Sequence, residues 1–308
     1  MSVDFWINVG VLAGIYGIFT LGLQLNAGFT GLLNFGQAGF MAIGAYSVGI
    51  FVVSWGLPLW LAFLLAVALA VAAGMLVGIS ALRLRSHHFA IATIGFAEIV
   101  RYTLQNAEFS GGNQGLIGFD DDWRSVNEWA LSKLASVELD AYTQLPLLLA
   151  IWATFLVLLV TMELLQRTPW ARVLRGIRED EDATAALGKN TFSYKLQSLG
   201  IAAALAAIAG FFVSLNITYL YPTVFDPTFT FFGYAILVLG GLGSYTGVAL
   251  GSIIFWVLLE GTRLMETSLS AGQQSSLRFV IVGLSLILLS RLRPQGILGN
   301  RNELRAEP

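Results

Sequence analysis

Long apolar stretches dominate the pattern of hydrophobic and polar positions along the chain. A run of roughly 17 to 25 apolar residues is long enough to cross the hydrocarbon core of a bilayer as a helix. Such runs recur throughout the sequence. They lie near residues 8–26, 33–55, 58–82, 89–106, 145–165, 196–215, 229–242, 247–265 and 276–291. The pattern predicts an all-α polytopic integral membrane protein with about 8–10 transmembrane helices.

Two of these runs are unusually rich in glycine. The first reads GLLNFGQAGFMAIGAY and includes Asn34 and Gln37, and the second reads LGGLGSYTGVALGS. Glycine costs about 1 kcal/mol per residue in a helix relative to alanine. One explanation is close packing between helices. The other is that these helices are broken or re-entrant and line a polar translocation path, with Asn34 and Gln37 among its residues.

The distribution of charge between the runs predicts the orientation of the chain. Lys and Arg in short loops favour the cytoplasmic side. Basic residues gather between the third and fourth runs, in a loop over about residues 166–195, and in the C-terminal tail, whereas the loop over about residues 107–144 is mainly acidic. We therefore expect the basic segments in the cytoplasm and the acidic loop outside. With an odd number of crossings, the N-terminus lies outside and the C-terminus is cytoplasmic.

The composition agrees with a membrane protein and excludes several functions. Hydrophobic residues make up 56% of the 308 residues and charged residues 12%, which predicts a single membrane domain over residues 1–308. The net charge of −2 lacks the basic excess of a nucleic-acid-binding face. The chain has no cysteine, and the neighbouring His87 and His88 have no carboxylate close in sequence, so no metal site is expected.

The basic loop over residues 166–195 contains the charged segment REDEDATAALGK. Its acidic residues come first and Gly188 comes near its end, which predicts a helix of about two or three turns. Ala183, Ala186 and Leu187 would form a small apolar face on it. A helix this short is marginal alone in water. It therefore rests on the membrane or on its own protein, or it docks into a groove of a soluble partner, where its charged flank would set the register.

The same loop resembles the cytoplasmic loop of permease subunits in branched-chain amino acid ABC importers, written GRxxRxIRxDExxAxxLGxNxxxYK. This chain matches it closely, with alanine replacing the first glycine. Further stretches fall in the family's order, namely NAGFTGLLNFGQAGFMAIGAY, ALRLRSHHFAIATIGFAEIVR, GGNQGLIG, DPTFTF, VLGGLGSYTGVALG and RPQGILG. The long outer loop and the RPQGILG ending resemble the family's M-type subunits most. The family also includes urea and short-amide permeases, which remain an alternative.

The resemblance implies how the work is divided among subunits. Two ABC ATPase subunits would dock on the cytoplasmic loop, a second homologous permease subunit would complete the path, and a periplasmic or lipid-anchored binding protein would deliver the solute across the bacterial inner membrane. The chain has no G-x-x-x-x-G-K-[ST] phosphate loop, so ATP and magnesium would be bound by the partners, and this chain would hold no cofactor. The expected coupling residues are Arg175, Arg178, Glu179, Asp180, Asp182, Ala183, Ala186, Leu187 and Gly188.

Two charged residues fall at membrane depth in the fourth run, where each charge is costly. Glu98 and Arg101 are three positions apart and share a helix face, so they can neutralise each other. Alternatively, they line the translocation path with Asn34 and Gln37 and steer the solute or close a gate. Intramembrane carboxylates also suit an ion-coupled secondary transporter, a different class of function. No H-E-x-x-H or G-x-S-x-G motif indicates an enzyme.

Overall fold

The computed structural model describes residues 3–84, 86–135, 142–261 and 295–299, with a few isolated positions between 276 and 291. These parts are helical, and they contain no strand beyond one isolated bridge between Leu116 and Leu220. The main elements are α1 (Val3–Leu23), η1 (Gln24–Thr30), α2 (Gln37–Trp55), α3 (Leu59–Ala81), α4 (Ser86–Asn106), α5 (Asp121–Leu134), α6 (Leu145–Leu165), α7 (Pro169–Glu179), α8 (Glu181–Ala186), α9 (Thr191–Ile217), η5 (Pro222–Phe225), α10 (Pro227–Gly240) and α11 (Tyr245–Gly261).

The described helices confirm a polytopic α-helical chain. Five stretches are long and apolar enough to cross a membrane: Val3–Thr30, which joins α1 to η1, and helices α2, α3, α6 and α9. Helices α10 and α11 are together long and apolar enough to form a sixth span, but they are bent by 115° at the break between them. The sequence predicted these two runs as separate spans. Within the described residues each is too short alone, with 14 and 17 residues. The predicted span at 276–291 lies largely outside the described residues.

Close helix packing and interruptions of the helices are both found, at different glycines. The chain leaves helical geometry between η1 and α2 and again at Gly241, whose φ of 111° is favourable only for glycine. Other glycines bring helices into close contact. A Cβ on Gly44 would lie 2.4 Å from the Cα of Ala207, and one on Gly210 would lie 2.2 Å from the carbonyl oxygen of Met41. Helices α2 and α9 therefore cross at backbone contact distance.

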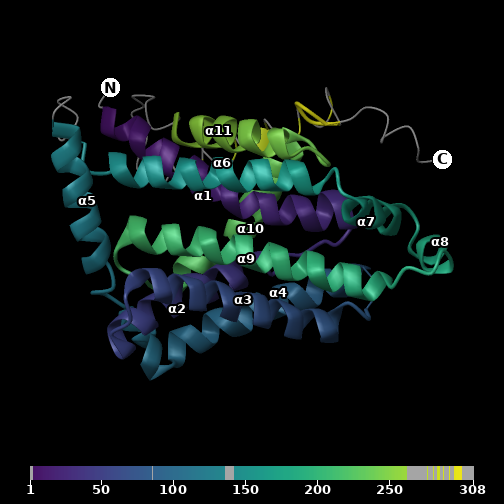
Figure 1. Ribbon diagram of the computed structural model, residues 1–308, viewed down its shortest axis with the longest axis horizontal. Helices are drawn as coiled ribbons and strands as arrows, with labels where there is room; N and C mark the ends of the chain where they lie inside the picture. The colour runs from purple at the N-terminus through teal and green to yellow at the C-terminus, as the bar shows by residue number, and fades with distance from the viewer. Residues whose placement is uncertain are drawn as a thin grey trace.

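Helix α9 forms the centre of the bundle and packs against α1, α2 and α3 (Figure 1). Most of its middle is buried, and the residues there are mainly alanine, glycine and leucine. Small side chains let the neighbouring helices approach closely where surrounding lipid supplies no hydrophobic driving force for association. The helices around α9 therefore pack at short distances through small side chains.

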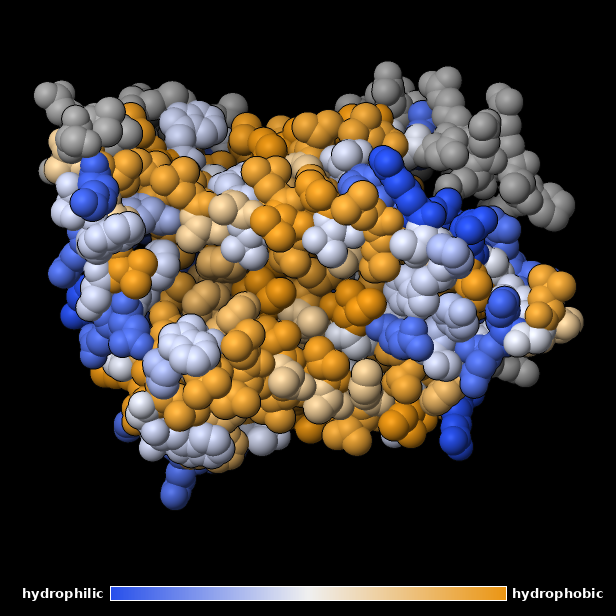
Figure 2. Space-filling view, viewed as in Figure 1, coloured by the Kyte–Doolittle hydropathy of each residue, from blue (hydrophilic) through white to orange (hydrophobic). Residues whose placement is uncertain are grey.

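The surface is divided into an apolar belt and two polar ends. Figure 2 shows hydrophobic side chains across the middle of the molecule and hydrophilic ones at both ends. Helix α5 of the acidic loop lies at one end, and α7 and α8 lie at the other (Figure 1). The turn between α3 and α4 lies with α7, because Leu82, Leu84 and Ile177 line one cavity of about 170 Å³. The loops thus group at the two ends as their charges predict.

Candidate functional site

The basic loop folds into two consecutive helices. In α7 the hydroxyl of Thr168 caps the N-terminus by accepting a hydrogen bond from Ala171 N at 3.4 Å. Proline follows at the first helical position, where its missing N–H costs nothing. Along the helix, one residue in three is buried against the bundle. The residue that follows each buried one is an exposed arginine. The buried residues are Ala171, Leu174 and Ile177, and the arginines are Arg172, Arg175 and Arg178.

Helix α8 is shorter than the sequence predicted. It spans six residues, Glu181–Ala186, whereas a helix of two or three turns was expected, and Glu179 belongs to α7 instead. The cause is Asp180, whose extended backbone interrupts the helix and whose carboxylate accepts a hydrogen bond from Ala183 N at 2.9 Å. Beyond the helix, Gly188 has a φ of 79° and ends the segment as predicted.

The expected apolar face of α8 points away from the rest of the chain. Ala183 and Ala186 are exposed, and Leu187 is 81% exposed. Thr184 is buried instead, and its hydroxyl donates to the carbonyl of Asp180 at 2.8 Å. The described part of this chain therefore does not cover the Ala183, Ala186 and Leu187 face. That face is free to contact another molecule.

Several side-chain contacts tie this loop to the membrane helices, and none of them was predicted from the sequence. Trp170 Nε1 of α7 donates a hydrogen bond to Gln197 Oε1 of α9 at 2.8 Å. Lys195 at the start of α9 forms an ion pair with Glu181 of α8. In α7, Arg178 Nη1 donates a hydrogen bond to the carbonyl of Gly28. The π-helical geometry of η1 is unusual, and such segments are frequent at functional sites. A motion of α7 would therefore act directly on the end of the first span.

Segment η1 in turn contacts the break between α10 and α11. The ring of Phe29 stacks on that of Tyr245, with centroids 4.9 Å apart and an interplanar angle of 10°. The guanidinium of Arg175 lies 5.4 Å from the centroid of the Phe29 ring. Gln24 Nε2 donates to the carbonyl of Gly241 at 3.3 Å. A continuous series of contacts thus runs from α7 through η1 to the bent pair of helices.

The predicted path residues Asn34 and Gln37 lie in the protein interior. Asn34 Nδ2 donates to Gln37 Oε1 at 2.9 Å, and Gln37 Nε2 donates to the carbonyl of Ala202 at 2.9 Å. The Asn34 side chain also accepts from Gly36 N at 3.0 Å. Both side chains are completely buried. Asn34 satisfies the backbone where the chain leaves helical geometry, and Gln37 links α2 to α9. Contact with solute stays a prediction.

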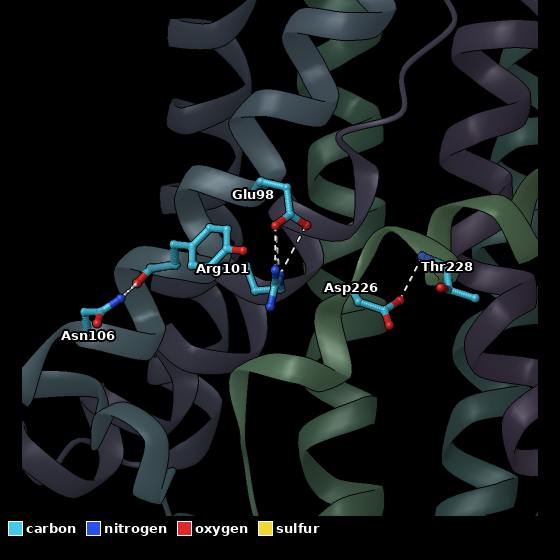
Figure 3. Close-up of polar contacts among 6 residues, drawn as sticks. Glu98, Arg101, Asn106, Asp226 and Thr228 are labelled. Atoms are coloured by element: carbon cyan, nitrogen blue, oxygen red, sulfur yellow. Dashed lines mark hydrogen bonds and ion pairs between the residues drawn. The ribbon is translucent and has the colours of Figure 1, made fainter.

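The other predicted path residues, Glu98 and Arg101, form a bidentate ion pair on α4 (Figure 3). Arg101 Nη2 lies 2.6 Å from Glu98 Oε2, and Arg101 Nε lies 3.2 Å from each carboxylate oxygen. The side chains are 16% and 27% exposed for arginine and glutamate, respectively. Figure 3 also shows Asp226 at the start of α10. Its carboxylate caps α10 by accepting a hydrogen bond from Thr228 N. The pair is neutral overall and partly exposed on the surface of this chain.

Comparison with known proteins indicates a transport family. The family described as branched-chain amino acid transport system / permease component matches residues 5–290. The high-affinity branched-chain amino acid transport system permease protein LivM of Salmonella typhimurium is 33% identical over 305 residues, which is 95% of this chain and 69% of the relative. The probable branched-chain amino acid transport permease protein LivM of Methanocaldococcus jannaschii is 24% identical over 97% of this chain and 94% of the relative.

A second kind of permease is similar to part of the chain. The high-affinity branched-chain amino acid transport system permease protein LivH of Salmonella typhimurium is 32% identical over 154 residues, covering 48% of this chain and 46% of the relative. No solved structure is significantly similar to the chain.

Proposed function

Because the chain belongs to the branched-chain amino acid transport permease family, we propose that its α7–α8 loop couples ATP hydrolysis by partner subunits to solute movement. The chain is a multi-pass permease subunit of an importer for branched-chain amino acids. The observation that carries the proposal is the uncovered apolar face of Ala183, Ala186 and Leu187 on a loop that contacts the membrane helices. An ATPase groove would cover that face, and the ATPases would hold ATP and magnesium.

The contacts of α7 support a rigid-body mechanism of transmission. Closure of two ATPase subunits would push α8, and the Lys195–Glu181 ion pair would carry the motion to α9. Arg178 would carry it to Gly28 in η1. The acidic residues Glu179, Asp180 and Asp182 would set the register in the groove through charge. A second permease subunit and a binding protein that delivers the solute complete the proposed importer of the bacterial inner membrane.

The proposal requires the α7–α8 end to face the cytoplasm. We expect a cysteine at Ser125 on α5 to react with an impermeant thiol reagent in intact cells whose outer membrane is permeable to it. A cysteine at Lys189 should react only after the membrane is disrupted. Both positions are exposed, so the difference reports the side of the membrane rather than burial. The chain has no native cysteine to label. Reversed labelling would reject the orientation and the coupling role together.

The contact between α7 and η1 predicts a separation of docking from transport. We expect Arg178→Ala to retain ATPase copurification but to lower solute uptake about fivefold or more, because removing a charge-assisted hydrogen bond costs about 1.5–3 kcal/mol. Arg172→Ala is the matched control, since Arg172 is an exposed arginine of the same helix, whereas Arg178 donates to Gly28. Radiolabelled uptake and pull-down measure the two quantities. Equal uptake by both variants would contradict the proposed transmission route.

A further inference from the structure

Gly95 in the middle of α4 is an exposed glycine without a structural reason inside this chain. A Cβ added there would find no atom within 4 Å. Within helices α1–α11, every other interior glycine would bring an added Cβ within 4 Å of a neighbouring atom. Gly261 and Gly283 also have open space, but Gly261 is the last residue of α11 and Gly283 lies outside these helices. Glycine is a poor helix former, so its presence in mid-span calls for a contact that this chain does not provide.

The face of α4 that contains Gly95 also carries charge at membrane depth. Ile91, Gly95, Glu98 and Tyr102 follow one another at spacings of four, three and four residues, which places them on one stripe. Glu98 and its partner Arg101 are partly exposed there. A charged pair facing hydrocarbon is unfavourable even when it is paired, and intramembrane charges almost always face a bundle interior or a water-filled space. Both observations therefore indicate that lipid does not cover this stripe.

The lipid-facing helices of the same chain look different. The exposed large side chains of α3 include Leu69, Leu76 and Ile79, and those of α6 include Val157 and Val160. The described exposed faces of these two helices lack charged side chains across their middle. Helices α3 and α6 are each long and apolar enough to cross a membrane. Helix α4 has 21 residues but is not apolar enough. The α4 stripe thus differs from the exposed faces of α3 and α6.

We infer that the α4 stripe of Ile91, Gly95, Glu98 and Tyr102 is the surface on which a sister permease subunit packs. The inference rests on the proposed function, in which a second permease completes the path. A helix of the sister would approach α4 most closely at Gly95, where no side chain keeps the backbones apart. The Glu98–Arg101 pair would lie at the edge of that contact, shielded from lipid by the two subunits.

The comparisons favour a related but different permease as the occupant. One bacterium has two permeases named for the same transport system, and this chain is similar to both. One of them aligns along nearly the whole chain and the other along about half of it. A chain that resembles the second is therefore the expected partner. A second copy of this chain and a lipid layer are the competing occupants.

Replacing Gly95 by leucine tests the surface without disturbing the subunit. The space around Gly95 is open and leucine is the better helix former, so Gly95→Leu should insert and fold at the native level. When both permeases and the ATPases are produced together, the copurified sister subunit should fall at least tenfold. Ala72→Leu is the matched control, because Ala72 is a small exposed residue in mid-span on α3. It should retain the sister.

A photoreactive amino acid then identifies the occupant directly. Ile91 and Leu76 are 69% and 68% exposed, so a cross-linker at either position is equally accessible in the isolated subunit. We expect position 91 to form an adduct with the sister permease, identified by mass spectrometry, and position 76 to form none. Full retention of the sister by Gly95→Leu, an adduct with a second copy of this chain, or an adduct from position 76 alone would each overturn the inference.

The readouts separate this inference from the coupling proposal. If the chain works without ATPases, none will copurify with the native protein, yet sister retention can still be measured. If only the α4 surface is assigned wrongly, ATPases will copurify and Gly95→Leu will behave as the native protein does.

Discussion

Leu187→Asp is expected to abolish copurification of the ATPase subunits while the permease remains inserted and folded. Leu187 is 81% exposed in this chain, so the substitution leaves no internal contact unsatisfied. In the complex it would place a charge in an apolar groove. A central interface residue is worth about 2 kcal/mol or more, which is roughly a thirtyfold loss of affinity. Pull-down from mild detergent, with the ATPase-to-permease ratio read from the gel, measures the effect.

Two controls separate docking from general damage. Leu187→Lys should lose the ATPases as well, because the desolvation of a charge does not depend on its sign. Leu187→Met should retain them, since methionine conserves size and apolar character. Val126→Asp, at an exposed position on α5 at the opposite end, should also retain them. A full complement of ATPase on Leu187→Asp would refute the docking role of the α8 face.

The sequence predicted the location of the coupling segment better than its internal structure. The acid-first order and Gly188 predicted a helix, and α8 is there, but Asp180 divides the loop into α7 and α8. Helix α7 was missed because its arginines were interpreted as charge that sets orientation. The signal available in the sequence was an apolar residue at every third position, Ala171, Leu174 and Ile177, which the structure shows to be buried.

The contacts of the path candidates could not be read from the sequence, because their partners are distant along the chain. Gln37 donates to the carbonyl of Ala202, and Tyr234 donates to the carbonyl of Asn34 at 3.2 Å. Periodicity reports which face of a helix is apolar, but it does not report which helix will lie beside it. By contrast, the Glu98–Arg101 pair lies within one helix, so its spacing predicted it correctly.

The ion pair between Glu98 and Arg101 predicts how single and double replacements change the stability of the subunit. Glu98→Gln or Arg101→Gln alone should destabilise the subunit by about 2 kcal/mol, less than the roughly 3–5 kcal/mol of a fully buried pair, because the side chains are partly exposed. The folded amount in the membrane should fall accordingly. The double replacement leaves no unpaired charge, and the two changes touch each other, so their effects should not add. We expect the double variant to recover the folded amount.

Uptake by the double variant then decides between charge pairing and solute contact. Arg101 donates hydrogen bonds to both carboxylate oxygens of Glu98 at 2.6–3.2 Å, so the geometry favours mutual neutralisation. We therefore expect reconstituted vesicles containing the double variant to regain most of the native uptake. The basal ATPase rate, measured in the same vesicles, reports whether the assembly is intact. A double variant that assembles with its ATPases and hydrolyses ATP but does not transport would contradict this expectation. It would instead place the Glu98–Arg101 pair beside the moving solute, since only a role in the path would then require the charges themselves.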